Sequence, residues 1–158
     1  MNIERITLTP RTVLGVRETV QPEGMAEFFA RAMGQAYRAL QDLGLQPAGP
    51  PVAVYRGSPE RGFDVTAGFP VASAVSAPTG LEVTELPAGQ AVAALHVGSY
   101  DSMTESYDEI ATWMTDHRFT PADPMWEEYL TGPDMNPDPA AWRTRIVFPL
   151  AESGPPNH

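Results

Sequence analysis

Two adjacent carboxylates stand in a segment that is otherwise apolar or aromatic. Glu127 and Glu128 belong to the sequence MWEEYL, residues 125–130. This composition predicts a β-strand, in which successive side chains turn to opposite faces of the sheet. Burying a carboxylate without a partner is costly, so these residues are expected either to serve a ligand or to be solvated near a sheet edge. Spacing alone leaves open which of the two lines a binding site.

The other polar residues form no motif for metal, cofactor or nucleophile chemistry. The chain has no cysteine, and its three histidines (His96, His117 and His158) have no metal-ligand spacing with each other or with acids. It also lacks a glycine-rich phosphate loop. Ser102 and Glu105 have the spacing of a capping box, which predicts a helix start. We therefore expect no metal and no cofactor.

An internal repeat defines the elements that must position the carboxylates. Residues 45–55 align with residues 119–129, and residues 63–71 align with residues 142–150. Two prolines, an alanine, a tyrosine and a Phe-Pro pair fall in register. A helix-like segment, and before it a strand-like segment, precedes the matched residues in each copy. The chain is therefore predicted to use a strand-helix-strand-strand unit twice.

Hydrophobic periodicity and turn residues give the expected limits of these elements. Apolar residues at three-and-four spacing predict helices at residues 22–43 and 101–117. Strands are predicted from alternation and from β-branched and aromatic content. Their expected ranges are 3–8, 11–19, 52–56, 63–71, 81–86, 90–97, 125–130 and 142–150.

The predicted organisation is one domain of residues 1–150, with repeat halves at about 1–79 and 80–150 and a disordered tail at 151–158. The fold class is α+β, with duplicated β-α-β-β modules related by pseudo-two-fold symmetry in an antiparallel sheet. Both helices are expected on one face and a ligand groove on the other. The first copy has Ala53 where the second has Glu127, so the shared fold does not explain the glutamate.

Charge narrows the classes of partner. The net charge is −10, and the chain has no lysine. Residues 1–79 hold seven acids and seven arginines, whereas residues 80–158 hold thirteen acids and three arginines. Such a chain repels nucleic-acid phosphates and anionic lipid, and it favours a cationic small molecule or a basic partner. With no apolar run near membrane-spanning length and no signal-peptide pattern, a cytoplasmic protein is expected.

The MWEEYL segment, together with Gly132-Pro133 and residues 142–149, resembles the GyrI-like family, the effector-binding domain of many bacterial multidrug-responsive regulators. Residues 51–55 and 97–100 are also similar, and the resemblance extends over nearly the whole chain. It implies a central groove that binds or sequesters lipophilic, cationic or aromatic small molecules. Because nothing that could form a helix-turn-helix precedes Met1, the chain looks like a stand-alone member without direct nucleic-acid binding.

The resemblance also implies which residues form the site. The family's groove glutamate maps onto Glu127, not Glu128, and the aromatic walls are expected to be Tyr55, Tyr100, Tyr129 and Trp142. A flat cation between such walls gains cation–π contacts of about 0.5–2 kcal/mol each. Glu128 departs from the family pattern and is assigned to a helix-facing or edge position.

Two alternatives to binding stay open. Some stand-alone members of the family hydrolyse reactive cyclopropane-bearing natural products, and in that case Glu127 would be the catalytic base, with its pKa raised by burial. The other alternative is a protein-binding module, such as the gyrase inhibition from which the family takes its name.

Overall fold

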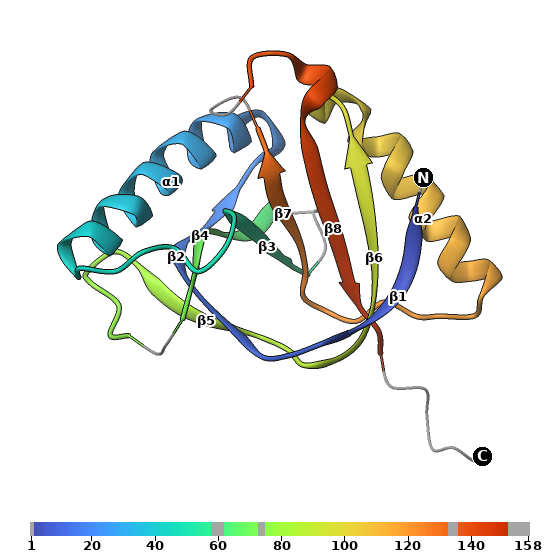
Figure 1. Ribbon diagram of the computed structural model, residues 1–158, viewed down its shortest axis with the longest axis horizontal. Coiled ribbons are helices and arrows are strands. Elements are labelled where there is room, and N and C mark those ends of the chain that lie inside the picture. Colours follow the sequence, from blue (N-terminus) through green and yellow to red (C-terminus); the bar gives the residue numbers. More distant parts are fainter. Residues whose placement is uncertain (1, 58–61, 73–74, 133–135, 152–158) are drawn as a thin grey trace.

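An eight-stranded antiparallel sheet and two helices form the described part of the chain (Figure 1). The computed structural model describes residues 2–57, 62–72, 75–132 and 136–151. The predicted tail therefore lies, apart from Ala151, outside the described residues. The strands are β1 (Ile3–Leu8), β2 (Arg11–Val20), β3 (Val52–Arg56), β4 (Phe63–Val71), β5 (Glu82–Leu86), β6 (Gly89–Val97), β7 (Met125–Thr131) and β8 (Arg143–Pro149). The helices are α1 (Met25–Asp42) and α2 (Met103–Asp116).

The predicted elements are confirmed, and the strand limits agree to within one residue. Both helices begin later than predicted because a short 3₁₀ turn precedes each one, at Pro22–Gly24 and at Tyr100–Ser102. The predicted capping box is wrong. The Ser102 side chain makes no cap bond to the helix and donates instead to the Ser99 carbonyl oxygen, 2.9 Å away. The Ser99 hydroxyl caps the 3₁₀ turn by accepting from the Asp101 amide.

Strand order confirms the duplicated module. The sheet runs β1-β6-β8-β7-β3-β4-β2-β5, so the strands of the first unit and those of the second form mirror-ordered halves that meet at β3 and β7. The two leading strands are exchanged, since β1 pairs with β6 and β5 pairs with β2. Each unit therefore closes the edge of the other, which explains why the halves form a single sheet.

The pseudo-two-fold axis passes through the pair Ala53 and Glu127. These residues lie directly opposite each other in the β3–β7 ladder, and they are also equivalent positions in the aligned repeats. The helices flank this axis, with α1 over one half of the sheet and α2 over the other (Figure 1). The single carboxylate at the axis is thus within reach of side chains from both helices.

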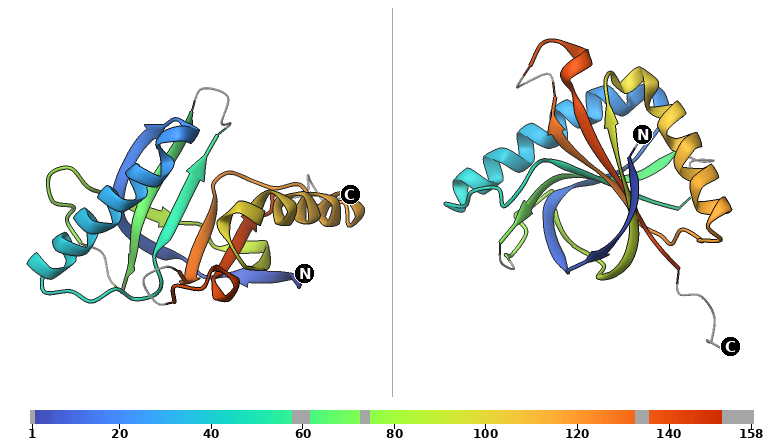
Figure 2. Two further views of the ribbon diagram at one scale, coloured as in Figure 1. Left: turned by 90° about the horizontal axis from the view of Figure 1, so that it is seen from above. Right: turned by 45° about the vertical axis from the view of Figure 1, so that its right-hand side comes forward.

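The sheet is strongly curled into a half-barrel, and each of its faces has its own core. The helix-bearing face packs on α1 and α2. The opposite face closes on itself around Val13, Val54, Trp126 and Val147, where the connections β1–β2 and β5–β6 arch away from the helices (Figure 2). Gly15 and Gly68 face each other across β2 and β4, and a Cβ at Gly68 would lie 2.0 Å from the Leu14 carbonyl oxygen. Only glycine permits this close approach.

Candidate functional site

Glu127 lies at the centre of a buried cluster of tyrosines. Its side chain comes from the middle of β7, and the residue is only 8% exposed. The Tyr129 hydroxyl donates to Oε1 at 2.6 Å, and the Tyr107 hydroxyl of α2 donates to Oε2. Within the described ranges no arginine lies within ion-pairing distance of this carboxylate. Glu127 is therefore a buried acid that hydroxyls stabilise in place of a counter-ion.

The structure places this cluster on the helix-bearing face, whereas the sequence analysis expects the ligand groove on the opposite face. Tyr107 reaches Glu127 from α2, and Phe29 of α1 packs edge-on against Tyr129 with ring centroids 6.1 Å apart. Strand alternation identifies which residues share a face but not which face receives the helices. The two helices flank Glu127, and the site lies between them.

Burial controls the ionisation of the cluster. Removal from water raises the pKa of the Glu127 carboxyl above its ordinary value, and the hydrogen bonds from Tyr107 and Tyr129 partly oppose this shift. Burial, together with the negative charge of Glu127, also raises the pKa values of Tyr55, Tyr107 and Tyr129. The phenols therefore stay protonated and act as donors toward the carboxylate.

Glu128 lies on the opposite face and already has charged partners. Arg11 approaches Oε2 at 3.1 Å and Arg145 approaches Oε1 at 3.4 Å. The Trp126 indole nitrogen also donates to Oε2, at 3.1 Å. Glu128 is buried on a central strand and contacts Trp126 on the face away from the helices, so its assignment to a helix-facing or edge position is wrong. Two guanidinium groups neutralise this carboxylate inside the half-barrel, which leaves it no role toward a ligand on the other face.

The predicted aromatic residues are only partly brought together. Tyr129 joins Glu127 to a pair formed by Tyr100 and Trp142, whose ring centroids are 4.9 Å apart, and Tyr100 meets Tyr129 edge-on at 6.0 Å. Tyr100 is 39% exposed and so forms the outer side of this wall. Tyr55 comes from β3, on the other side of the axis, and its hydroxyl joins the cluster by hydrogen bonding with Glu127 and Tyr129, while its ring packs against Phe63.

Tyr107 is the site residue that sequence reasoning missed. Its spacing from Met103, Ile110 and Met114 is that of an apolar helix stripe, which predicts a core position, whereas its hydroxyl bonds to Glu127. A comparison of the two repeat copies identifies Tyr107. Met25 and Met103 begin the two helices, so Phe29 and Tyr107, each four residues further on, occupy equivalent positions. The second copy therefore adds a hydroxyl where the first has none, close to the glutamate that it also adds.

His96 anchors the start of α2 through both of its ring nitrogens. Its Nδ1 lies 2.6 Å from the Ser106 hydroxyl, and its Nε2 lies 2.8 Å from the Ser99 carbonyl oxygen. In the described part of the chain no group of three or more histidines and acids is arranged to hold a metal ion.

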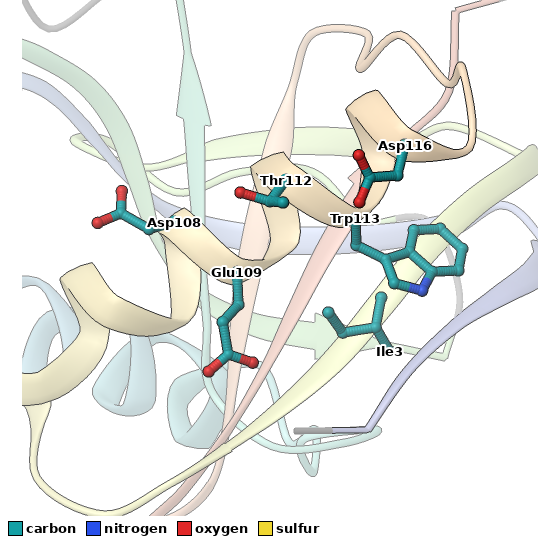
Figure 3. A pocket seen from close by; sticks show the side chains of 6 residues that line it. All are labelled: Ile3, Asp108, Glu109, Thr112, Trp113 and Asp116. Carbon is teal, nitrogen blue, oxygen red and sulfur yellow. The ribbon is translucent and has the colours of Figure 1, made fainter.

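The surface depressions lie beside α2 and do not reach Glu127. One is lined by Ile3 of β1 and by Asp108, Glu109, Thr112, Trp113 and Asp116 of α2. Figure 3 shows Trp113 against Ile3, with carboxylates along the helix. The other lies around His96, Ser102 and Glu105. Neither of these two depressions is lined by Glu127. Among the described helices none is long and apolar enough to cross a membrane.

The match to a known family agrees with the observed fold. Residues 1–151 match the family described as GyrI-like small molecule binding domain. The chain therefore belongs to the GyrI-like family. None of the curated proteins matches the sequence.

Solved structures share the fold at low sequence identity. The C-terminal domain of EcmrR is 20% identical, with a TM-score of 0.80, and the match covers 96% of this chain and 98% of that domain. EcmrR in a DNA complex has a TM-score of 0.83 at 20% identity. That match covers 96% of this chain but only 58% of the EcmrR chain. SAV2435 bound to tetraphenylphosphonium has a TM-score of 0.70 at 14% identity, with coverage of 96% and 95%. A hydrolase from Listeria innocua has a TM-score of 0.66 at 17% identity, with coverage of 94% and 91%.

Proposed function

We propose that this domain binds lipophilic organic cations between its two helices, with Glu127 as the counter-charge and with Tyr55, Tyr100, Tyr129 and Trp142 as aromatic walls. The observation that carries the proposal is the buried Glu127 carboxylate, whose described polar partners are phenol hydroxyls and not guanidinium groups. The phenols and the nearby His96 compensate the desolvation cost of this carboxylate only in part, since its pKa is still raised. A bound cation offsets that cost and so gains affinity.

The aromatic residues supply the lipophilic part of the recognition. Aromatic faces attract cations without a demand for matched hydrogen bonds, at about 0.5–2 kcal/mol per contact. The partly exposed Tyr100 and its stacking partner Trp142 lead from the surface to Tyr129 and then to the acid. The SAV2435 structure, which contains tetraphenylphosphonium, shows that this fold accommodates a cation of the proposed class.

A thermal-shift titration with tetraphenylphosphonium tests the proposal. At one hundred times its dissociation constant, a ligand adds about 2.7 kcal/mol to the free energy of unfolding. For a chain of this size that energy raises the Tm by roughly 5–10 °C. Triphenylphosphine oxide, a neutral molecule of related shape, should give a much smaller shift. Equal responses to the two compounds, or no response to the cation, contradict the proposal.

Hydrolysis is a second candidate, favoured by the ionisation of Glu127. A carboxyl with a raised pKa beside two phenols suits a general base that takes a proton from water. The water oxygen would bond to one carbon of a strained cyclopropane as a ring C–C bond breaks. One water proton would pass to Glu127, which then protonates the released carbon, and the other proton stays on the new hydroxyl. Mass spectrometry of an incubated cyclopropane-bearing alkylator tests this, since the product gains one water and Glu127→Gln should abolish the gain. Recovery of the compound unchanged rules out this reaction.

The sequence also supports proposals for the partners and the cellular location of this domain. The net charge of −10 supports an absence of direct nucleic-acid binding by these residues. The proposed cytoplasmic location is supported by the absence of a long apolar run and of a signal-peptide pattern in the sequence. EcmrR is seen bound to DNA, but this chain spans only 58% of the EcmrR chain. A protein partner such as gyrase stays a prediction, and it would bind whether or not a small cation is present.

A further inference from the structure

A buried hydroxyl near Glu127 lacks a hydrogen-bond partner. Thr144, on β8, is 0% exposed, and its Oγ1 is unpaired, alone among the buried side-chain nitrogen and oxygen atoms of the described residues. Leaving such a group unpaired costs roughly 1–3 kcal/mol, so an orphan of this kind calls for an explanation.

The polar side chains on either side of Thr144 in the sheet form hydrogen bonds with other groups. Thr144 lies between Tyr129 of β7 and His96 of β6 in the sheet, and all three face the helices. The Tyr129 hydroxyl donates to Glu127, and both ring nitrogens of His96 are engaged by Ser106 and Ser99. The two polar side chains beside Thr144 therefore leave its hydroxyl unpaired.

The repeat shows that the fold itself does not need this hydroxyl. Residues 63–71 align with residues 142–150, so Val65 occupies the position of Thr144 in the first copy, and it is also 0% exposed. Valine has nearly the shape of threonine without its polar atom. The second copy thus adds a polar group near the site where it also adds Glu127 and Tyr107.

We propose that Thr144 is a hydrogen-bonding subsite for the ligand. The proposal rests on the function proposed above and narrows its substrate class. The ligands are lipophilic cations that also carry a hydroxyl or carbonyl group. Thr144 is the diagonal cross-strand neighbour of Glu127, which separates the two positions by about 7–8 Å. The polar group of the ligand therefore lies a few bonds from its cationic centre, toward β8, while its apolar groups pack toward Phe29 and α1.

Two phosphonium ions of matched shape test the subsite. Butyltriphenylphosphonium and (3-hydroxypropyl)triphenylphosphonium differ only by a methyl or a hydroxyl at the end of one chain. Isothermal titration gives the dissociation constant of each for the wild type and for Thr144→Val. Comparing the ratio of the two constants between the wild type and Thr144→Val cancels differences in ligand hydration. Loss of one neutral hydrogen bond should reduce the preference for the hydroxyl ligand roughly 3- to 10-fold in Thr144→Val.

Thr66→Val is the matched control. Thr66 is also 0% exposed, but it lies on the opposite face and accepts a hydrogen bond from Arg56 at 3.0 Å. This variant should lower the Tm and leave the ligand ratio unchanged. Thr144→Val should instead keep or raise the Tm, because it removes an unpaired polar atom.

The outcomes separate the subsite from the general function. If both phosphonium ions bind the wild type and Thr144→Val leaves their ratio unchanged, the subsite is overturned and cation binding stands. A lower Tm in Thr144→Val with an unchanged ratio shows that the hydroxyl serves the fold, and this also overturns the subsite. If neither ion binds the wild type, the proposed function fails and the subsite fails with it.

Discussion

Replacing each of the two adjacent glutamates by glutamine should separate ligand binding from stability. Glu127→Gln keeps the side-chain shape and removes the charge that faces the proposed cation site. A contact with a charged group contributes about 1.5–3 kcal/mol. The affinity for tetraphenylphosphonium should therefore fall roughly 10- to 150-fold. Triphenylphosphine oxide should lose much less affinity, because it carries no net charge.

The free energy of unfolding should fall in Glu128→Gln and not in Glu127→Gln. Burial already penalises the charge of Glu127, so Glu127→Gln should keep or increase the free energy of unfolding at neutral pH. Glu128→Gln breaks the ion pairs with Arg11 and Arg145, whose side chains are 29% and 37% exposed. A fully buried pair would cost about 3–5 kcal/mol, and solvent screening of the arginines reduces this to about 1–2 kcal/mol.

Urea denaturation and isothermal titration on the two variants measure both effects. The expected pattern is loss of cation binding with retained stability for Glu127→Gln, and loss of stability with retained binding for Glu128→Gln. If Glu128→Gln abolishes cation binding while the protein stays folded, the assignment of the binding face is wrong. If Glu127→Gln destabilises the protein by several kcal/mol, the carboxylate serves the fold and the argument from its burial fails.

The remaining predictions concern ionisation and helix termination. The pKa of Glu127 is raised in the folded protein. Its contribution to the free energy of unfolding is therefore present below the ordinary glutamate pKa and is lost as the pH rises through the raised value. Urea denaturation of the wild type and Glu127→Gln at a series of pH values should show this loss as a change in the stability difference between them. Tyr107→Phe removes a hydrogen-bond donor to the Glu127 carboxylate and should raise the pKa of Glu127 further. NMR titration measures this pKa, and an unchanged value would show that the hydrogen bond from Tyr107 is weak. Arg118 ends α2 with a φ of 61°, where the first repeat has Gly44. Arg118→Gly should therefore raise the free energy of unfolding by about 1 kcal/mol, and a lower Tm would contradict this.

The duplicated architecture follows from local sequence. The two strand-helix-strand-strand units are visible in periodicity and in the aligned Phe-Pro pairs, since side-chain spacing along a strand or helix depends on nearby residues alone. The contrast between Ala53 and Glu127 also drew attention to the residue that lies on the symmetry axis. In these respects the sequence was sufficient to predict the fold and the central acid.

The chemistry around that acid depends on contacts between distant segments. Alternation separates Glu127 from Glu128 but leaves undetermined which of them the helices cover. That choice follows from the packing of α1 and α2 and from the curl of the sheet, which brings Arg11 across the half-barrel to Glu128. Thr144 looks ordinary in sequence, and its lack of a partner appears only once the partners of Tyr129 and His96 are known. Burial and hydrogen-bond pairing are properties of the assembled chain, so only the tertiary structure decided them.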